Sequence, residues 1–176
     1  MPKKLKTLEL NRISIEAFKA ADKTPIVVLL DDVRSALNVG SVFRTSDAFR
    51  IEQIALCGIT AAPPHRDIRR TALGATDSVE WTHNASATEV LEQYRTNGYK
   101  ILAIEQAEDS VALNDFIPQE NEKYVLVFGN EVEGVKQEIV DFADAVIEIP
   151  QYGTKHSFNI SVSAGIVLWD VFSKLK

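Results

Sequence analysis

The chain has 176 residues, of which 45% are hydrophobic and 25% charged, and its formal net charge is -6. This length suits one compact domain with a full hydrophobic core, and no apolar run approaches the roughly 20 residues of a membrane span. Cys57 is the only cysteine, which excludes an intrachain disulfide and a zinc site built on several cysteines. Because the basic start of the chain lacks the apolar segment of a signal peptide, we expect a cytoplasmic protein.

Two basic stretches stand out against the acidic total. Residues 1–24 hold six lysines and arginines against three acids, and residues 65–70 read HRDIRR. Solvated surface charge explains such stretches, and so does a local patch that binds nucleic acid. Both readings stay open on charge alone.

Strands and helices alternate along the chain. Apolar residues at helical spacing predict an N-terminal helix over residues 8–21, before Pro25. We then expect main strands at 25–33, 51–59, 99–105, 124–129 and 145–149, a short strand at 79–81, a turn around 109–117, and helices at 38–49, 65–73, 85–97, 134–143 and 159–174. Such alternation with apolar strands predicts an α/β fold: a mostly parallel sheet with helices on both faces. We divide the chain into a basic N-terminal helical arm, residues 1–24, and an α/β domain, residues 25–176.

A first polar loop follows the strand at 25–33. Asn38 is expected to cap the next helix, and Gly40 to let another backbone come close. Arg44 lies six residues beyond Asn38. It is either a surface charge or a guanidinium aimed at a phosphate, whose oxygens suit its planar donors.

A second polar loop follows the strand at 124–129 and reads FGNEVEG. We expect Gly129 to leave room for a flat ligand against the backbone. Glu131, between two glycines, either serves a site or stabilises the helix that follows through its dipole. The loop is not a P-loop, because no Gly-Lys-Ser/Thr sequence follows.

A third polar loop joins the strand at 145–149 to the last helix. Ser157 and Asn159 alternate around Phe158, so we expect them to point one way while Phe158 enters an apolar pocket. Either polar residue is also a candidate helix N-cap. Ligands of open α/β sheets bind at the carboxyl ends of the strands, so the three loops are expected to meet around a cofactor.

Together, the sequences NVGSVFRTSDAF, VFGNEVEG and IPQYGTKHSFNISVSAG resemble the motif set of the SpoU/TrmH-like RNA ribose 2′-O-methyltransferases, a branch of the SPOUT superfamily. The motifs occur in family order over about residues 25–174. The resemblance implies a domain with a deep C-terminal trefoil knot and S-adenosylmethionine as the cofactor, with no metal. It also implies a homodimer whose RNA sites are each built from both subunits.

The resemblance also assigns roles to individual residues. The expected cofactor contacts are Ile104, Gly129, Gly134, Ile149 and Phe158. The residues that match the family's catalytic site are Asn38, Arg44, Glu131, Ser157 and Asn159. The cations that we expect to contact RNA are Arg66, Arg69, Arg70 and Lys155.

Three mild departures from the family pattern leave this polar set untouched: Arg50 for a frequent Gly, Phe158 for a common Leu and Val135 for a common Leu. The sequence contains no separate RNA-binding domain before residue 25, and its small size favours tRNA over rRNA as the substrate. A non-catalytic knotted RNA-binding protein is one alternative, although such a protein would not need the whole polar set. A nucleotide- or flavin-binding module without transferase activity is another, and the missing Gly-rich phosphate loop argues against it.

Overall fold

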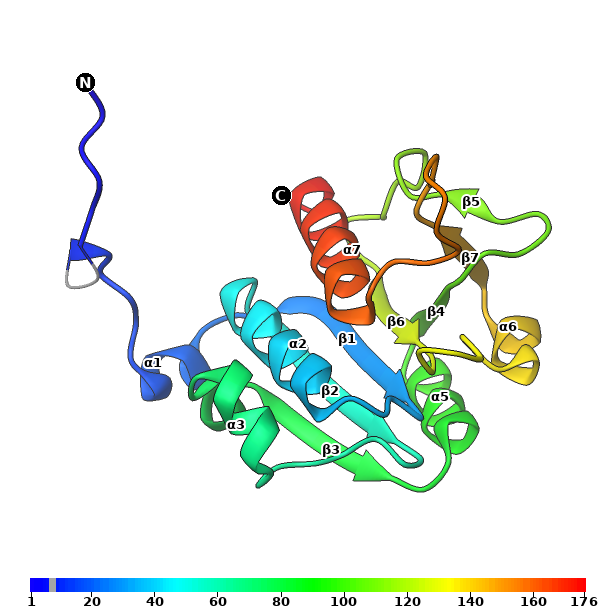
Figure 1. Cartoon of the computed structure of the whole chain (residues 1–176), viewed down its shortest axis with the longest axis horizontal. Coiled ribbons are helices and arrows are strands. Elements are labelled where there is room, and N and C mark those ends of the chain that lie inside the picture. The colour runs from blue at the N-terminus through cyan, green and yellow to red at the C-terminus, as the bar shows by residue number, and fades with distance from the viewer. Residues whose placement is uncertain (7–8) are drawn as a thin grey trace.

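A seven-stranded sheet forms the centre of the computed structural model, which describes residues 1–6 and 9–176 (Figure 1). The strand order is β3-β2-β1-β6-β4-β7-β5, and each pair of neighbours is parallel. The strands are β1 Thr24–Asp31, β2 Ile51–Cys57, β3 Glu80–Asn84, β4 Tyr99–Ile104, β5 Val111–Ala112, β6 Lys123–Phe128 and β7 Ala145–Glu148. The parallel α/β sheet expected from the sequence is confirmed.

Helices cover both faces of this sheet. They are α1 Ile15–Ala20, α2 Ala36–Ala48, α3 Arg66–Ala72, α4 Ala75–Ser78, α5 Ala87–Thr96, α6 Gln137–Phe142 and α7 Ile160–Lys174. Alternate residues of β1 explain the two layers, because successive side chains of a strand point to opposite faces. Val28 and Leu30 belong to the core beneath α2, α3 and α7, whereas Val27 and Leu29 belong to the core beneath α5 and α6.

Several element boundaries differ from the expected ones. The N-terminal helix spans only α1, because Asn11 adopts a left-handed backbone (φ 47°) and Ser14 caps the helix by accepting from the Ala17 N–H. Residue 8, where that helix was expected to begin, lies outside the described residues. Helix α6 begins at Gln137 rather than at residue 134. The sequence predicted neither α4 nor β5, and β5 lies within the expected turn.

The order of the strands places a switch point beside β1. From β1 the chain passes to β2 and β3 on one side, and it later places β6, β4 and β7 on the other. The carboxyl ends of strands next to such a point form a crevice where ligands bind. Among the described helices, none has both the length and the apolar character needed to cross a membrane. The trefoil knot implied by the resemblance stays a prediction.

Candidate active site

A cavity of about 530 Å³ opens at the carboxyl ends of β4, β6 and β7. Its wall comes from the end of β4, the loop after β6, the loop after β7 and the start of α7. All five residues expected to contact a cofactor lie in this wall: Ile104, Gly129, Gly134, Ile149 and Phe158. These residues therefore meet at the carboxyl ends of β4, β6 and β7, of which β6 lies directly beside β1 at the switch point.

The three polar loops meet at Asn38. Its side-chain amide donates to Oε1 of Glu131 at 3.3 Å, and its Oδ1 accepts from Nδ2 of Asn159 at 3.2 Å. These residues stand 93 and 121 positions from Asn38 in the chain. Glu131 and Asn159 also line the cavity, as does Ser157. Four of the five expected catalytic residues therefore lie in or directly beside it.

Asn38 does not cap α2, contrary to the expectation from the sequence. Ser35 is the N-cap residue, and its hydroxyl accepts from the Asn38 backbone N–H at 3.3 Å. Asn38 lies in the first turn of α2, which frees its side chain for Glu131 and Asn159. The sequence SALN offered two candidate caps, Ser35 and Asn38, and serine is as good an N-cap as asparagine.

Glu131 binds the start of α2. Its two carboxylate oxygens accept from the backbone N–H groups of Arg34 and Ser35, each at 2.9 Å. Partial burial acts to raise the pKa of Glu131, but these amide donors and Asn38 hold it below its ordinary value. The carboxylate thus stays charged near neutral pH. Glu131 therefore stabilises a helix N-terminus, which was one of its two expected roles. The helix is α2, however, and not the helix that follows Glu131 in the sequence.

Asn159 has two functions at once. It is the N-cap of α7, because its Oδ1 accepts from the Ser161 backbone N–H at 2.9 Å. Its Nδ2 remains free to donate to Asn38. Asn159 can therefore be both a helix N-cap and a residue of the polar cluster that it forms with Asn38 and Glu131 at the cavity. Phe158 beside it lines the cavity while 40% of the residue remains exposed.

Gly129 allows the loop after β6 to close on itself. Asn130 and Gly134 exchange backbone hydrogen bonds of 2.9 and 3.0 Å across that loop. A Cβ atom at position 129 would lie 2.1 Å from the Gly134 carbonyl oxygen. The space that we expected Gly129 to leave for a flat ligand is therefore used largely by the chain's own backbone.

Glu105 is a cavity residue that the sequence did not reveal. It follows β4 directly, and its Oε2 accepts from the Val135 N–H at 2.9 Å. A Cβ at Gly134 would lie 2.2 Å from that same oxygen. Glu105 therefore links the end of β4 to the loop between β6 and α6, residues 129–136, which we call the glycine loop. An acid at the end of the strand predicted at 99–105 was the signal that would have identified it.

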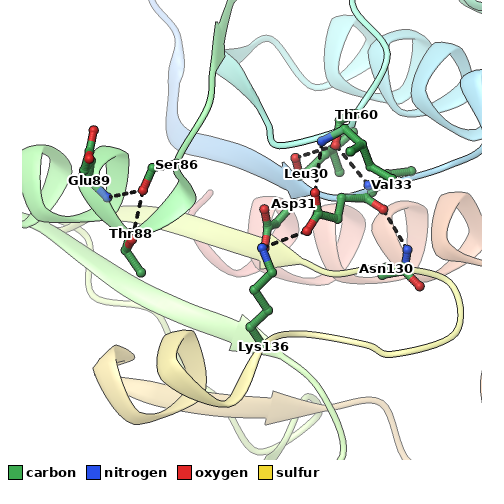
Figure 2. Close-up of polar contacts among 11 residues, drawn as sticks. Leu30, Asp31, Val33, Thr60, Ser86, Thr88, Glu89, Asn130 and Lys136 are labelled. Atoms are coloured by element: carbon green, nitrogen blue, oxygen red, sulfur yellow. Dashed lines mark hydrogen bonds and ion pairs between the residues drawn. The ribbon is translucent and has the colours of Figure 1, made fainter.

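An ion-pair cluster around the buried carboxylate of Asp31 fixes the other end of the glycine loop (Figure 2). Nζ of Lys136 lies 2.9 Å from Oδ2 of Asp31 and 2.7 Å from Oδ2 of Asp32, and Asn130 donates to the Asp32 carbonyl at 2.8 Å. Asp31 is only 2% exposed, and burial raises its pKa although Lys136 opposes that effect. Asn130 and Lys136, on either side of Glu131, are thus both attached to the end of β1.

Replacing Lys136 with methionine is expected to lower the free energy of unfolding by about 1–3 kcal/mol, since it leaves a buried carboxylate unpaired. Lys136 itself is 46% exposed, so the cost is below that of a fully buried pair. The loss is complete above the pKa of Asp31 and shrinks as the pH falls through it, because protonated Asp31 needs no counter-ion. Urea unfolding at several pH values measures this. The charge-preserving Lys136→Arg variant is the control, and an equal loss at all pH values would contradict the assignment.

The expected cationic residues lie outside the cavity wall. Arg44 is exposed on α2, less than two turns beyond Asn38. Arg66, Arg69 and Arg70 are exposed on α3, and Lys155 is exposed in the loop after β7. Arg44 is therefore on the same helix as Asn38, but it does not line the cavity of its own chain.

Gly40 places α3 directly against α2, as expected of a close backbone approach. A Cβ at position 40 would lie 2.4 Å from the Ile68 carbonyl oxygen. In addition, the Thr71 hydroxyl donates to the Leu37 carbonyl at 2.9 Å. The arginines of α3 are thus carried by a helix that packs on the turn of α2 containing Asn38.

The described residues contain no group of three or more His, Cys, Asp or Glu side chains suited to a metal ion. Cys57 is fully buried, and burial raises the pKa of its thiol to about 12. A thiol with that pKa remains protonated near neutral pH. Cys57 is consequently a core residue, packed beneath α5 and α6.

Comparisons with known proteins agree with the motif pattern. Residues 25–169 match the SpoU rRNA Methylase family. A 23S rRNA (guanosine-2′-O-)-methyltransferase of Neisseria meningitidis is 25% identical over 159 residues, which are 90% of this chain and 62% of that protein. A tRNA (guanosine(18)-2′-O)-methyltransferase of Aquifex aeolicus is 29% identical over 151 residues, or 82% of this chain and 67% of that enzyme.

Solved structures show the same fold. The A. aeolicus TrmH/SpoU tRNA modifying enzyme superposes with a TM-score of 0.79 and 27% identity, over 91% of this chain and 79% of that one. An AdoMet-bound rRNA methyltransferase from Sinorhizobium meliloti gives a TM-score of 0.77 and 27% identity, over 87% of this chain and 58% of that one. The chain thus spans less than two thirds of the N. meningitidis and S. meliloti proteins.

Proposed function

This chain belongs to the SpoU rRNA Methylase family, and on that premise we propose that it transfers a methyl group from S-adenosylmethionine to a ribose 2′-hydroxyl of RNA. One observation carries the proposal. The three motif loops meet through Asn38, Glu131 and Asn159 at the edge of a cavity. A structural role for any one loop would not require the polar residues of all three to converge there.

The cavity suits a cofactor of this size and character. Its volume lies in the range of ligand pockets, which combine apolar walls with a few polar groups. Ile104, Ile149 and Phe158 supply apolar surface, and the glycine loop would offer backbone groups for hydrogen bonds to the cofactor. When bound, S-adenosylmethionine supplies a methyl group that its sulfonium already activates. The protein then has to align the nucleophile and remove its proton.

Arg44 is proposed to hold the RNA phosphate next to the reacting ribose and to stabilise the developing alkoxide. A guanidinium remains protonated in proteins, so phosphate or water takes the proton from the 2′-hydroxyl. Asn38, held by Glu131, and Asn159 would orient the ribose, with Ser157 beside them. Glu131 is proposed to act mainly by fixing α2, the helix that carries Arg44.

A homodimer is proposed to complete the site. Arg44 lies outside the cavity of its own chain, and an apolar patch is exposed close to the α2–α7 contact. The patch consists of Val162 and Trp169 of α7, at helical spacing, with the rings of Phe49 and Phe172 beside Trp169. Trp169 is 59% exposed. A second chain on this patch would bury it and would bring one chain's Arg44 towards the partner's cavity.

We expect Trp169→Asp to shift the protein towards monomers and to lower methyl transfer at least about tenfold, because a charge in an apolar interface opposes association. Light scattering coupled to gel filtration measures the mass. The matched control is Ile59→Asp, an equally drastic change at a 69% exposed isoleucine in the loop after β2. A Trp169→Asp protein that keeps both the mass and the activity of the wild type would rule out this interface.

The substrate is proposed to be tRNA, by analogy with the A. aeolicus enzyme, and rRNA is the second candidate, by analogy with the N. meningitidis enzyme. The deciding experiment offers methyl-labelled S-adenosylmethionine with bulk tRNA or bulk rRNA and locates the label by nuclease digestion. Label on a ribose 2′-oxygen supports the reaction, and the RNA that carries it names the substrate. Cofactor binding with no transfer to either RNA would favour a non-catalytic RNA-binding protein.

A further inference from the structure

A second cavity, of about 590 Å³, lies between the Pro63–Pro64 segment, helices α3 and α4, and the edge strand β3. It shares no lining residue with the first cavity. Trp81 of β3 forms an aromatic wall, and its half-buried side chain packs against the core beneath α2 and α3. The second cavity therefore presents an aromatic surface that the core holds in place.

Two opposite charges line this cavity without pairing. Arg69 comes from the last turn of α3 and Asp77 from α4. Within residues 1–6 and 9–176, neither side chain has an ion-pair partner. A guanidinium and a carboxylate on one cavity, each without a partner, are available to a ligand that carries both an anionic group and hydrogen-bond donors.

Two further arginines lie on α3, the helix that carries Arg69. Arg66 and Arg70 are exposed on α3 with Arg69, and the nearest acid to Arg70 is Asp67, at 3.9 Å. In Figure 1, α3 lies beside α2 on the same side of the sheet. Three arginines on one short helix favour a polyanion over a small zwitterion, and this helix packs on the turn of α2 that contains Asn38.

We propose that the second cavity binds a guanine nucleotide of the RNA, separate from the nucleotide that is methylated. This subsite rests on the proposed function, because it presumes an RNA substrate. Trp81 stacks on the base, Arg69 contacts a phosphate and the Asp77 carboxylate accepts from the base edge. Stacking of bases on aromatic side chains is the common mode by which proteins hold unpaired RNA.

The Asp77 carboxylate determines which base is preferred. A carboxylate accepts two hydrogen bonds when the donors are adjacent, and N1–H and the N2 amino group of guanine are adjacent donors. Adenine, cytosine and uracil each offer a single donor group on the corresponding edge. A second hydrogen bond to a charged acceptor separates the correct base from the others by about fivefold or more.

The test is a tryptophan fluorescence titration of the full-length protein with guanosine 5′-monophosphate and, separately, adenosine 5′-monophosphate. The expected result is saturable quenching with a preference for the guanine nucleotide of about fivefold or more. Saturating S-adenosylmethionine should leave the quenching and the preference for guanine unchanged, because the two cavities share no lining residue. The chain has two tryptophans, so Trp81→Phe, which keeps an aromatic ring, should remove the guanine-dependent signal.

Asp77→Ala should abolish the preference between the two nucleotides, whereas Glu120→Ala, at another exposed acid, should keep it. Equal quenching by both nucleotides in the wild type, unchanged quenching in Trp81→Phe, or no saturable quenching at millimolar nucleotide would each overturn the proposal. Quenching by a free α-amino acid but not by nucleotides would instead identify a zwitterion site.

Methyl-transfer kinetics separate this subsite from the proposed function. Asp77→Ala should raise KM for the RNA several-fold and leave kcat unchanged, because the residue lines a cavity that shares no residue with the active-site cavity. A wild-type protein that transfers no methyl group would contradict the proposed function, and the nucleotide titration would still report on the subsite. Normal KM in Asp77→Ala, with transfer intact, would contradict only the role of the subsite in RNA binding.

Discussion

Arg44→Ala is expected to lower methyl transfer by about a hundredfold or more, while the affinity for S-adenosylmethionine stays at the wild-type value. Arg44 is exposed on α2 and contributes nothing to the cavity wall, so its removal leaves the cofactor site intact. The lost interaction is one that strengthens as negative charge develops on the ribose oxygen. The effect should therefore appear mainly in kcat.

Calorimetric titration with the cofactor and single-turnover methyl transfer measure the two halves of this prediction. Lys100→Ala is the control, because Lys100 is an exposed cation near the amino end of β4, away from the cavity. Near-normal turnover in Arg44→Ala would remove this residue from the mechanism. Loss of cofactor binding would mean that Arg44 supports the fold of the site instead.

Gly129→Ala is expected to abolish cofactor binding and to lower the free energy of unfolding by about 1–3 kcal/mol. The added Cβ would meet the carbonyl oxygen of Gly134 at 2.1 Å and the backbone nitrogen of Val135 at 2.4 Å. These are backbone atoms held by the Asn130–Gly134 hydrogen bonds, so no side-chain rotation relieves the clash. The loop must open, and Glu131 would then move away from α2.

Gly153→Ala is the matched control, because a Cβ at that position meets nothing within 4 Å. Thermal unfolding and cofactor calorimetry should find it indistinguishable from the wild type. If Gly129→Ala binds the cofactor with wild-type affinity, the closed form of the loop is not needed for the site.

The centre of the sheet was predictable because strands such as β1 and β6 are buried on both faces and read as continuous apolar runs. The meeting of the polar loops was predictable for the same reason, since the carboxyl ends of parallel strands share one edge. The predicted start of the N-terminal helix was wrong. The apolar periodicity continues through Leu10 and Ile13, but these residues are exposed and precede the Ser14 cap. The local sequence pattern does not show which of several serine and asparagine residues forms the N-cap of a helix.

The residues missed by sequence analysis are those that act through partners distant in the chain. Asp31 and Asp32 lie about a hundred positions before Lys136, and Glu105 lies 30 positions before Val135. No periodicity or short motif encodes such pairings, because they depend on which strands become neighbours in the sheet. The one local anomaly present, the pair of aspartates inside the strand predicted at 25–33, was not used in the prediction.

The hydrogen bonds between Glu131 and the start of α2 connect the cavity wall to the helix that carries Arg44. The carboxylate holds the amides of Arg34 and Ser35 at the start of the helix, and the same loop forms one side of the cavity. If cofactor binding displaces that loop, the displacement reaches α2 and so Arg44, which we propose to contact the RNA. The two binding equilibria are then coupled, and each ligand must change the affinity for the other by the same factor.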